Sequence, residues 1–191
     1  MKEKLEYFLN AVHYCIYLEE CWSQRIVNKF FKKLLSPIPK YLFTDSYREK
    51  YYKRLESQQK ELDDYFFSKE AGQSIGLAHH LFGFFVTCYF VFIGFLLLGF
   101  LSKQFGVENV LGDGFVRMLI FAIPVTIGYI PVYKAVFSND VYLKFFNEFE
   151  KKDEKWHRKW KRITAAFVTL SIMMFLSGVF ITFIMLIPVF G

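Results

Sequence analysis

Two long stretches of the chain are apolar throughout, and segments rich in charge precede them. Residues 163–191 contain no charged side chain after Arg162, and residues 81–102 are also uncharged and rich in Phe, Leu and Val. A helix needs about 20 consecutive apolar residues to cross the hydrocarbon core of a bilayer, so each stretch is long enough. We therefore predict a first membrane span at about 77–101 and a third at 163–191.

A shorter apolar stretch lies between these two, from Phe115 to Val136. Arg117 and Lys134 bracket its uncharged centre, and their long side chains reach opposite headgroup layers of a bilayer. We predict a second span here. Pro124, Gly128 and Pro131 lie within it, on one helix face. Each proline removes a backbone hydrogen bond, so the sequence predicts a local kink, with a gating hinge or a pore constriction as the alternative.

The remaining segments show the periodicity of amphipathic helices. Apolar residues recur every three or four positions between Leu5 and Phe30, and Ser-Pro-Ile-Pro at 36–39 ends this pattern. A second helix is expected from Thr44 or Asp45, running on into the first span. A third amphipathic region, 137–162, is predicted to be a helical hairpin that docks on the N-terminal helices through Phe145, Phe149, Trp156 and Trp160.

Together these patterns predict an all-α integral membrane protein with four regions. Residues 1–76 form amphipathic helices, residues 77–136 hold the first two spans and a short loop at 102–114, residues 137–162 form the hairpin, and residues 163–191 form the third span. The spans have no charged residue near their centres, which disfavours an ion-coupled transporter.

Basic residues in the two connections predict the topology. The loop 102–114 contains one, Lys103, whereas 137–162 contains eight: Lys144, Lys151, Lys152, Lys155, Arg158, Lys159, Lys161 and Arg162. By the positive-inside rule, the hairpin and the N-terminal region are cytoplasmic, and the C-terminus lies outside. We expect a multi-pass protein of the inner (plasma) membrane. The net charge of +6 makes the lipid bilayer the expected partner.

Pairs of small residues predict close helix contacts. Gly72 and Gly76 form a Gly-xxx-Gly pattern at the entry to the first span, and Gly178 with Thr182 forms a weaker pair in the third. Such pairs allow helices to approach closely, within or between subunits. Three Phe-rich spans would pack poorly alone, so we expect a homo-oligomer.

Metal, cofactor and nucleic-acid sites are not expected. Glu154 and His157 have the Glu-x-x-His spacing of di-iron bundles, but such bundles need two of these motifs and further Glu residues. Interfacial positions explain His79 and His80, and His13 lies on the first amphipathic helix. The 13 basic residues of 1–76 are opposed by 11 acidic ones, which argues against direct nucleic-acid binding.

The segment Lys152-Asp153-Glu154-Lys155-Trp156-His157 resembles a divergent form of the HEPN motif. In that motif a basic residue, a polar residue and a later His lie on one helix, and in active HEPN ribonucleases the basic residue is Arg. Lys152 stands at this position, Asp153 at the polar position and His157 at the His position. Because Lys cannot bind phosphate through two parallel hydrogen bonds as Arg does, we do not expect an enzyme.

A HEPN-like helical part joined to membrane spans is similar to the small accessory membrane proteins encoded beside type VI CRISPR effectors. This resemblance implies an oligomeric membrane pore that strengthens RNA-guided antiviral defence, with a functional link to an RNA-guided nuclease. Two other interpretations remain open. One is a membrane scaffold or immunity-type binding protein without a pore, and the other is a membrane-bound HEPN-like ribonuclease that needs His157.

Overall fold

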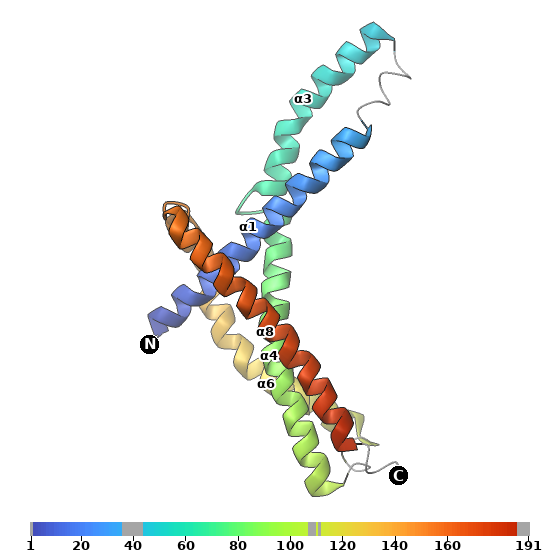
Figure 1. Cartoon of the computed structure of the whole chain (residues 1–191), viewed down its shortest axis with the longest axis vertical. Helices are drawn as coiled ribbons and strands as arrows, with labels where there is room; N and C mark the ends of the chain where they lie inside the picture. Colours follow the sequence, from blue (N-terminus) through green and yellow to red (C-terminus); the bar gives the residue numbers. More distant parts are fainter. Residues whose placement is uncertain (1, 36–43, 107–109, 111, 187–191) are drawn as a thin grey trace. The chain divides into compact units, whose positions relative to one another are not determined.

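The computed structural model describes residues 2–35, 44–106, 110 and 112–186, and these residues form helices and turns but no strand. Figure 1 shows the helices in chain order. Their bounds are α1 Lys2–Leu35, α3 Asp45–Phe67, α4 Gln73–Phe105, α6 Gly114–Val136, the short 3-10 helix η1 Ser138–Asp140, α7 Val141–Phe149 and α8 Glu154–Leu186. The all-α prediction is therefore confirmed.

Three of these helices, α4, α6 and α8, are long and apolar enough to cross a membrane. They coincide with the three predicted spans, and the protein is a membrane protein on this ground. The third differs from its predicted bounds, because α8 begins at Glu154, nine residues before the charge-free stretch, and one helix carries both the basic segment and the apolar one. The end of the predicted span, residues 187–191, lies outside the described residues.

The connection between α3 and α4 corrects a prediction. The two helices do not run on into each other, because a turn at 68–72 separates Phe67 from Gln73. The amide of Gly72 donates to the carbonyl of Ser68 over 3.0 Å. A Cβ at Gly72 would collide with that same carbonyl, so only glycine fits this tight turn. Sequence periodicity does not register such a turn, since apolar residues continue on both sides of it.

The chain forms two compact units, whose boundaries fall inside α1 and α4. Unit 1 comprises Met1–Val12 and Leu81–Gly191, and unit 2 comprises His13–His80. Within unit 2, α1 packs on the end of α3: the hydroxyl of Tyr17 donates to the carbonyl of Phe67 over 2.9 Å, and the guanidinium of Arg25 lies 5.1 Å from the centre of the Phe67 ring. These contacts fix which face of α1 is turned inward there.

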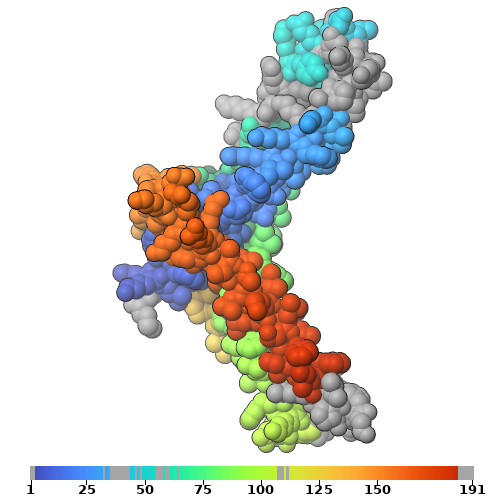
Figure 2. All heavy atoms as spheres, viewed as in Figure 1, coloured from blue at the N-terminus to red at the C-terminus, as the bar shows by residue number. Residues whose placement is uncertain are grey.

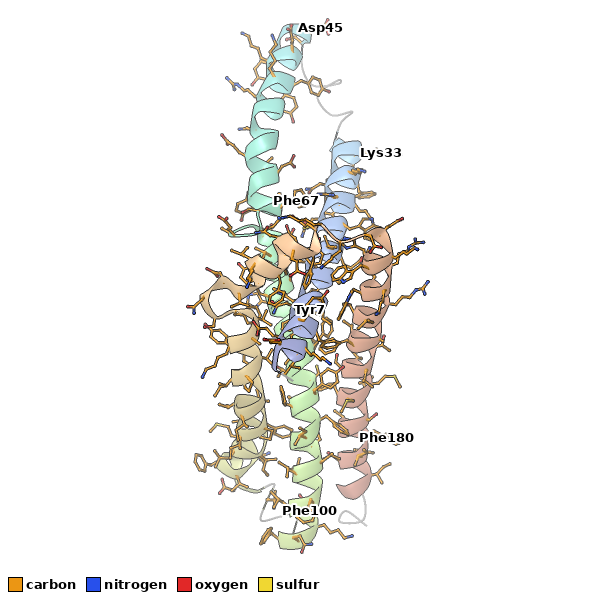
Figure 3. All side chains as sticks on the ribbon, turned by 90° about the vertical axis from the view of Figure 1, so that its left-hand side faces the viewer. Tyr7, Lys33, Asp45, Phe67, Phe100 and Phe180 are labelled. Atoms are coloured by element: carbon orange, nitrogen blue, oxygen red, sulfur yellow. The ribbon has the colours of Figure 1, made fainter. Side chains whose placement is uncertain are left out.

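In unit 1, α4 lies between α6 and α8 (Figure 3), and glycines receive aromatic rings on both sides of it. A Cβ at Gly128 of α6 would overlap the Phe90 ring. A Cβ at Gly178 of α8 would come within 2.7 Å of the Phe95 ring. The Thr182 hydroxyl lies 3.5 Å from the Phe95 carbonyl, so the predicted Gly178 and Thr182 pair is a helix contact within one chain.

A sharp corner separates α6 from α7. Asn139 and Asp140 have φ values of 55° and 52°, in the left-handed region that Asn and Asp adopt more readily than other residues with a side chain. The predicted helical hairpin is present, but its first helix starts at Val141 because of this corner, rather than at Phe137. A turn at 150–153 then leads into α8.

Candidate functional site

An aromatic cluster joins the start of α1 to the hairpin, within unit 1. Tyr7 of α1 lies with its ring centre 5.1 Å from that of Phe149, 5.8 Å from that of Trp160 and 6.3 Å from that of Phe145, all edge-on. The rings of Phe149 and Trp156 stack at 4.8 Å. The predicted docking of these four hairpin residues on the N-terminal helix is therefore confirmed, and Tyr7 is its centre.

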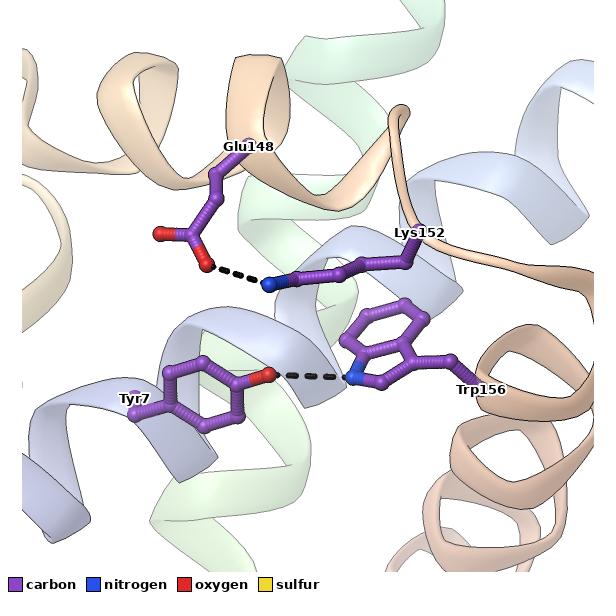
Figure 4. A network of polar contacts seen from close by, with 4 residues as sticks. All are labelled: Tyr7, Glu148, Lys152 and Trp156. Atoms are coloured by element: carbon purple, nitrogen blue, oxygen red, sulfur yellow. Dashed lines mark hydrogen bonds and ion pairs between the residues drawn. The ribbon is translucent and has the colours of Figure 1, made fainter.

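Polar contacts at the edge of this cluster fix its geometry (Figure 4). The indole Nε1–H of Trp156 donates to the Tyr7 hydroxyl over 3.0 Å. The ammonium of Lys152, in the turn, lies 2.8 Å from the carboxylate of Glu148 on α7. The hydrogen bond to Glu148 raises the pKa of Lys152 above its usual value. Lys152 thus links the turn to α7, and Trp156 links the start of α8 to α1.

The three residues of the HEPN-like motif do not lie on one helix. Lys152 and Asp153 precede Glu154, the first residue of α8, and only His157 lies within that helix. The carboxylate of Asp153 accepts a hydrogen bond from the Trp156 amide over 3.0 Å, which is the contact of an N-cap residue. Asp153 begins α8, and Lys152 is paired with Glu148. The local helix start explains the charged residues of this motif, and the resemblance stays a prediction.

A buried asparagine ties α1 to the end of α6. Asn10 is fully buried, and its amide donates to the carbonyls of Glu6, over 2.8 Å, and Ala135, over 3.0 Å. The Ala135 carbonyl lies in the last turn of α6, where carbonyls have no partner within the helix. Asn10 is not among the residues predicted from the sequence. Its position, a polar residue inside the apolar run from Leu9 to Tyr17, is the signal that marks it.

Two histidines meet inside unit 2. Nε2 of the fully buried His13 lies 2.9 Å from Nδ1 of His79, so one ring donates a hydrogen bond and the other accepts it. Burial lowers the pKa of His13 well below its usual value, and repulsion from a charged His79 lowers it further. His79 therefore pairs with His13, and its predicted position at the membrane interface stays a prediction. Among the described residues, no group of three potential metal ligands gathers here or elsewhere.

The predicted hinge residues lie inside an unbroken helix. Pro124 and Pro131 are both within α6, and Gly128 between them receives the Phe90 ring. Proline has no N–H, so the carbonyls four residues earlier, at Ile120 and Ile127, lose their helical donors. Ile120 is buried beside Gly94 of α4. A Cβ added at Gly94 would lie 3.3 Å from the backbone oxygen of Ile120. Ile127 is 68% exposed.

The outer face of α6, defined here as Ile123, Thr126, Ile127, Ile130 and Tyr133, is exposed along the helix. Arg117 and Lys134, near its two ends, are also exposed. This face thus combines apolar side chains with a hydroxyl, a phenol and a carbonyl freed by Pro131. On α4, the exposed large hydrophobic side chains are Leu77, Phe84, Ile93, Leu96, Leu97, Phe100 and Phe105, and the exposed polar ones lie toward its two ends, at Gln73, His80, Lys103 and Gln104.

The two glycines of the predicted contact pattern have different surroundings. Gly72 serves the turn before α4, as described above. A Cβ at Gly76 would meet no atom within 4 Å, so this position is open within the chain. A role of Gly76 in contact between subunits stays a prediction, whereas Gly72 has a reason to be glycine that needs no second subunit.

The sequence and the fold were compared with known proteins. No protein-family model matches the sequence, and neither a curated protein nor a solved structure is found to be similar to it.

Proposed function

We propose that the protein assembles in a membrane as a homo-oligomer in which α6 of several copies lines a pore or a membrane-perturbing path. The observation that carries this proposal is the outer face of α6. It is exposed, it contains the polar groups of Thr126 and Tyr133, and it includes Ile127, whose carbonyl loses its helical donor at Pro131. In an oligomer, such a face is suited to a wet path or to a subunit interface.

The freed carbonyl of Ile127 supports this orientation. A backbone carbonyl without a hydrogen-bond donor is costly in hydrocarbon, by several kcal/mol as an order of magnitude. Water in a path, or a donor from a neighbouring subunit, would remove this cost, whereas a lipid tail would not. In the proposed oligomer, the outer face of α6 is therefore directed toward the central axis, and the apolar face of α4 is directed toward lipid.

A single subunit is too small to enclose a path of its own. Rings of α4 fill the space toward both neighbouring helices, since Phe90 fits against Gly128 and Phe95 fits against Gly178. Several copies must therefore surround any continuous opening. This requirement connects the pore to the proposed homo-oligomer.

The proposed setting is the inner (plasma) membrane, with the N-terminus and the hairpin on the cytoplasmic side. Eight basic residues in 137–162, against one in 102–114, support this orientation. The resemblance to accessory proteins of type VI CRISPR systems suggests the biological role: the pore would strengthen RNA-guided antiviral defence by depolarising the infected cell. A ribonuclease is not favoured, because Asp153 caps α8 and Lys152 pairs with Glu148.

Purified protein in liposomes provides the test. We expect the wild-type protein to release a small trapped dye or to carry current. The double variant Pro124→Ala, Pro131→Ala restores the donors to Ile120 and Ile127 and should reduce this flux. Thr126→Val should also change it, while Thr169→Val, at an exposed threonine of α8, should not. Liposomes that stay tight with wild-type protein, at rest and under an applied potential, would contradict the pore and favour the scaffold.

A further inference from the structure

The outer half of α1, residues 22–34, leaves an apolar stripe uncovered in unit 2. Trp22, Ile26, Phe30 and Leu34 follow one another in steps of four and therefore lie along one side of the helix. All four are exposed, Trp22 and Phe30 each to 63%, and Val27 and Phe31 beside them are exposed as well. Figure 2 shows this half of α1 (blue) on the face turned to the viewer. Large exposed patches of this kind mark a surface that contacts something else.

The contacts of α1 explain why this stripe is turned outward. Tyr17 and Arg25 reach the end of α3 at Phe67 and so define the inner side of the helix. The angular step of an α-helix, about 100° per residue, places Phe30 on the opposite side from Tyr17 and well away from Arg25. The end of α3, at Phe67, therefore contacts a different face of α1 and leaves the stripe uncovered.

The charge of this segment identifies the kind of surface it would bind. Residues 22–35 contain four basic residues, Arg25, Lys29, Lys32 and Lys33, and no acidic residue. Lys29 and Lys33 are exposed and border the apolar stripe (Lys33 is labelled in Figure 3). By contrast, α3 carries five basic and six acidic residues. The basic charge of unit 2 is thus concentrated beside its exposed aromatic side chains.

We propose that residues 22–34 of α1 bind the headgroup layer of a membrane that contains anionic lipid. A helix with Trp and Phe on one face and Lys along its border is suited to lie in the plane of such an interface. A second copy of the same stripe is a poorer partner, because it would bring four positive charges against four. This docking surface is independent of the pore, since it needs only that the protein resides in the bilayer.

The test uses the full-length protein in vesicles of two compositions: phosphatidylcholine alone, and phosphatidylcholine with about 30% phosphatidylglycerol. An environment-sensitive fluorophore is attached at Phe30→Cys, and at Tyr65→Cys of α3 as a control of equal exposure. We expect a blue shift and quenching by headgroup-region nitroxide lipids for the α1 label in anionic vesicles, and a water-like spectrum for the α3 label.

Neutralising the border should weaken the contact. With Lys29→Gln and Lys33→Gln together, the partition constant of α1 for anionic vesicles should fall about thirtyfold, because each basic residue near an anionic surface contributes about 1 kcal/mol. Equal quenching in both vesicle types would overturn the role of anionic lipid. Protection of the label that depends on protein concentration and not on lipid would overturn the proposal in favour of a second copy. Protection by added single-stranded RNA alone would overturn it in favour of nucleic acid.

Discussion

The hairpin and the membrane spans of unit 1 use aromatic side chains in opposite ways. Around Tyr7, rings from α1, α7 and α8 cover one another, and Phe146 and Phe149 are fully buried. On the spans, rings such as Phe100 and Phe180 point away from the bundle (Figure 3) and are exposed. The hairpin therefore completes its packing within one chain, whereas the spans rely on lipid or on other subunits to cover them.

This difference separates two sources of stability. Burial of the hairpin rings contributes to the folded state of each chain in any solvent that keeps the fold. In lipid, exposed aliphatic and Phe side chains gain little from packing on one another, so close approach at small residues sets how the spans associate. Substitutions in the hairpin and in the spans should therefore differ in their effects on chain stability and on assembly.

Truncation of a hairpin ring should have the largest effect. Phe149→Ala removes a fully buried ring that contacts both Tyr7 and Trp156, and should cost about 3–5 kcal/mol of unfolding free energy. The matched variant Phe180→Ala removes a ring that is 63% exposed on α8 and should change stability little. Thermal unfolding in detergent measures both. Equal losses in the two variants would show that the hairpin is no better packed than the spans.

Enlarging a glycine should distinguish a contact within the chain from one between chains. Gly178→Leu forces a side chain into the Phe95 ring and should destabilise the chain by about 1–3 kcal/mol. Gly76→Leu enters open space and should leave the chain as stable as before. If Gly76 contacts another subunit, this second variant should still shift the oligomer toward smaller species in size-exclusion chromatography with light scattering. An unchanged oligomer would remove Gly76 from the subunit interface.

Acid should destabilise unit 2 through His13. Its pKa is lowered in the folded state, so the unfolded chain binds more protons in the range below the ordinary value near 6.5. Stability should therefore be constant above about pH 7.5 and fall as the pH drops through 6.5 toward the lower folded pKa. Thermal unfolding measured between pH 8 and pH 5 tests this. In His13→Gln the drop should be smaller, and an equally steep drop would assign it to other groups.

Removal of a single polar contact should have the smallest effect. Tyr7→Phe keeps the ring but deletes the hydroxyl that accepts the Trp156 indole N–H, at a cost of about 1 kcal/mol. Lys152→Gln breaks a partly exposed ion pair with Glu148, which should change stability less than Tyr7→Phe does. Both are measured against wild type by chemical unfolding in detergent. A larger loss for Lys152→Gln would give the turn at 150–153 more importance than its exposure suggests.

The sequence predicted the helices well where periodicity and length carry the information. Uncharged length identified α4, α6 and α8, and the Phe and Trp stripe identified the docking of the hairpin. Periodicity did not locate the turn at Gly72 or the corner at Asn139, because both are decided by single residues in unusual backbone positions rather than by a repeating pattern.

The contacts of single polar residues were harder to predict. His13 and Asn10 meet residues 66 and 125 positions away along the chain. No spacing rule connects such distant partners, so only the folded chain brings them together. The HEPN-like motif shows the opposite limit: six neighbouring residues satisfied a pattern, but the helix begins within it and gives Asp153 a capping role.

Current through the reconstituted protein, with single cysteines on two helices, tests the central claim most directly. The native Cys15, Cys21 and Cys88 are buried, and the parent protein serves as the control for their reaction. A charged thiol reagent should reduce the current of Ile127→Cys, on the outer face of α6, and leave that of Leu176→Cys, exposed on α8, unchanged. Block at Leu176→Cys but not at Ile127→Cys, or the absence of any current to block, would contradict a path lined by α6.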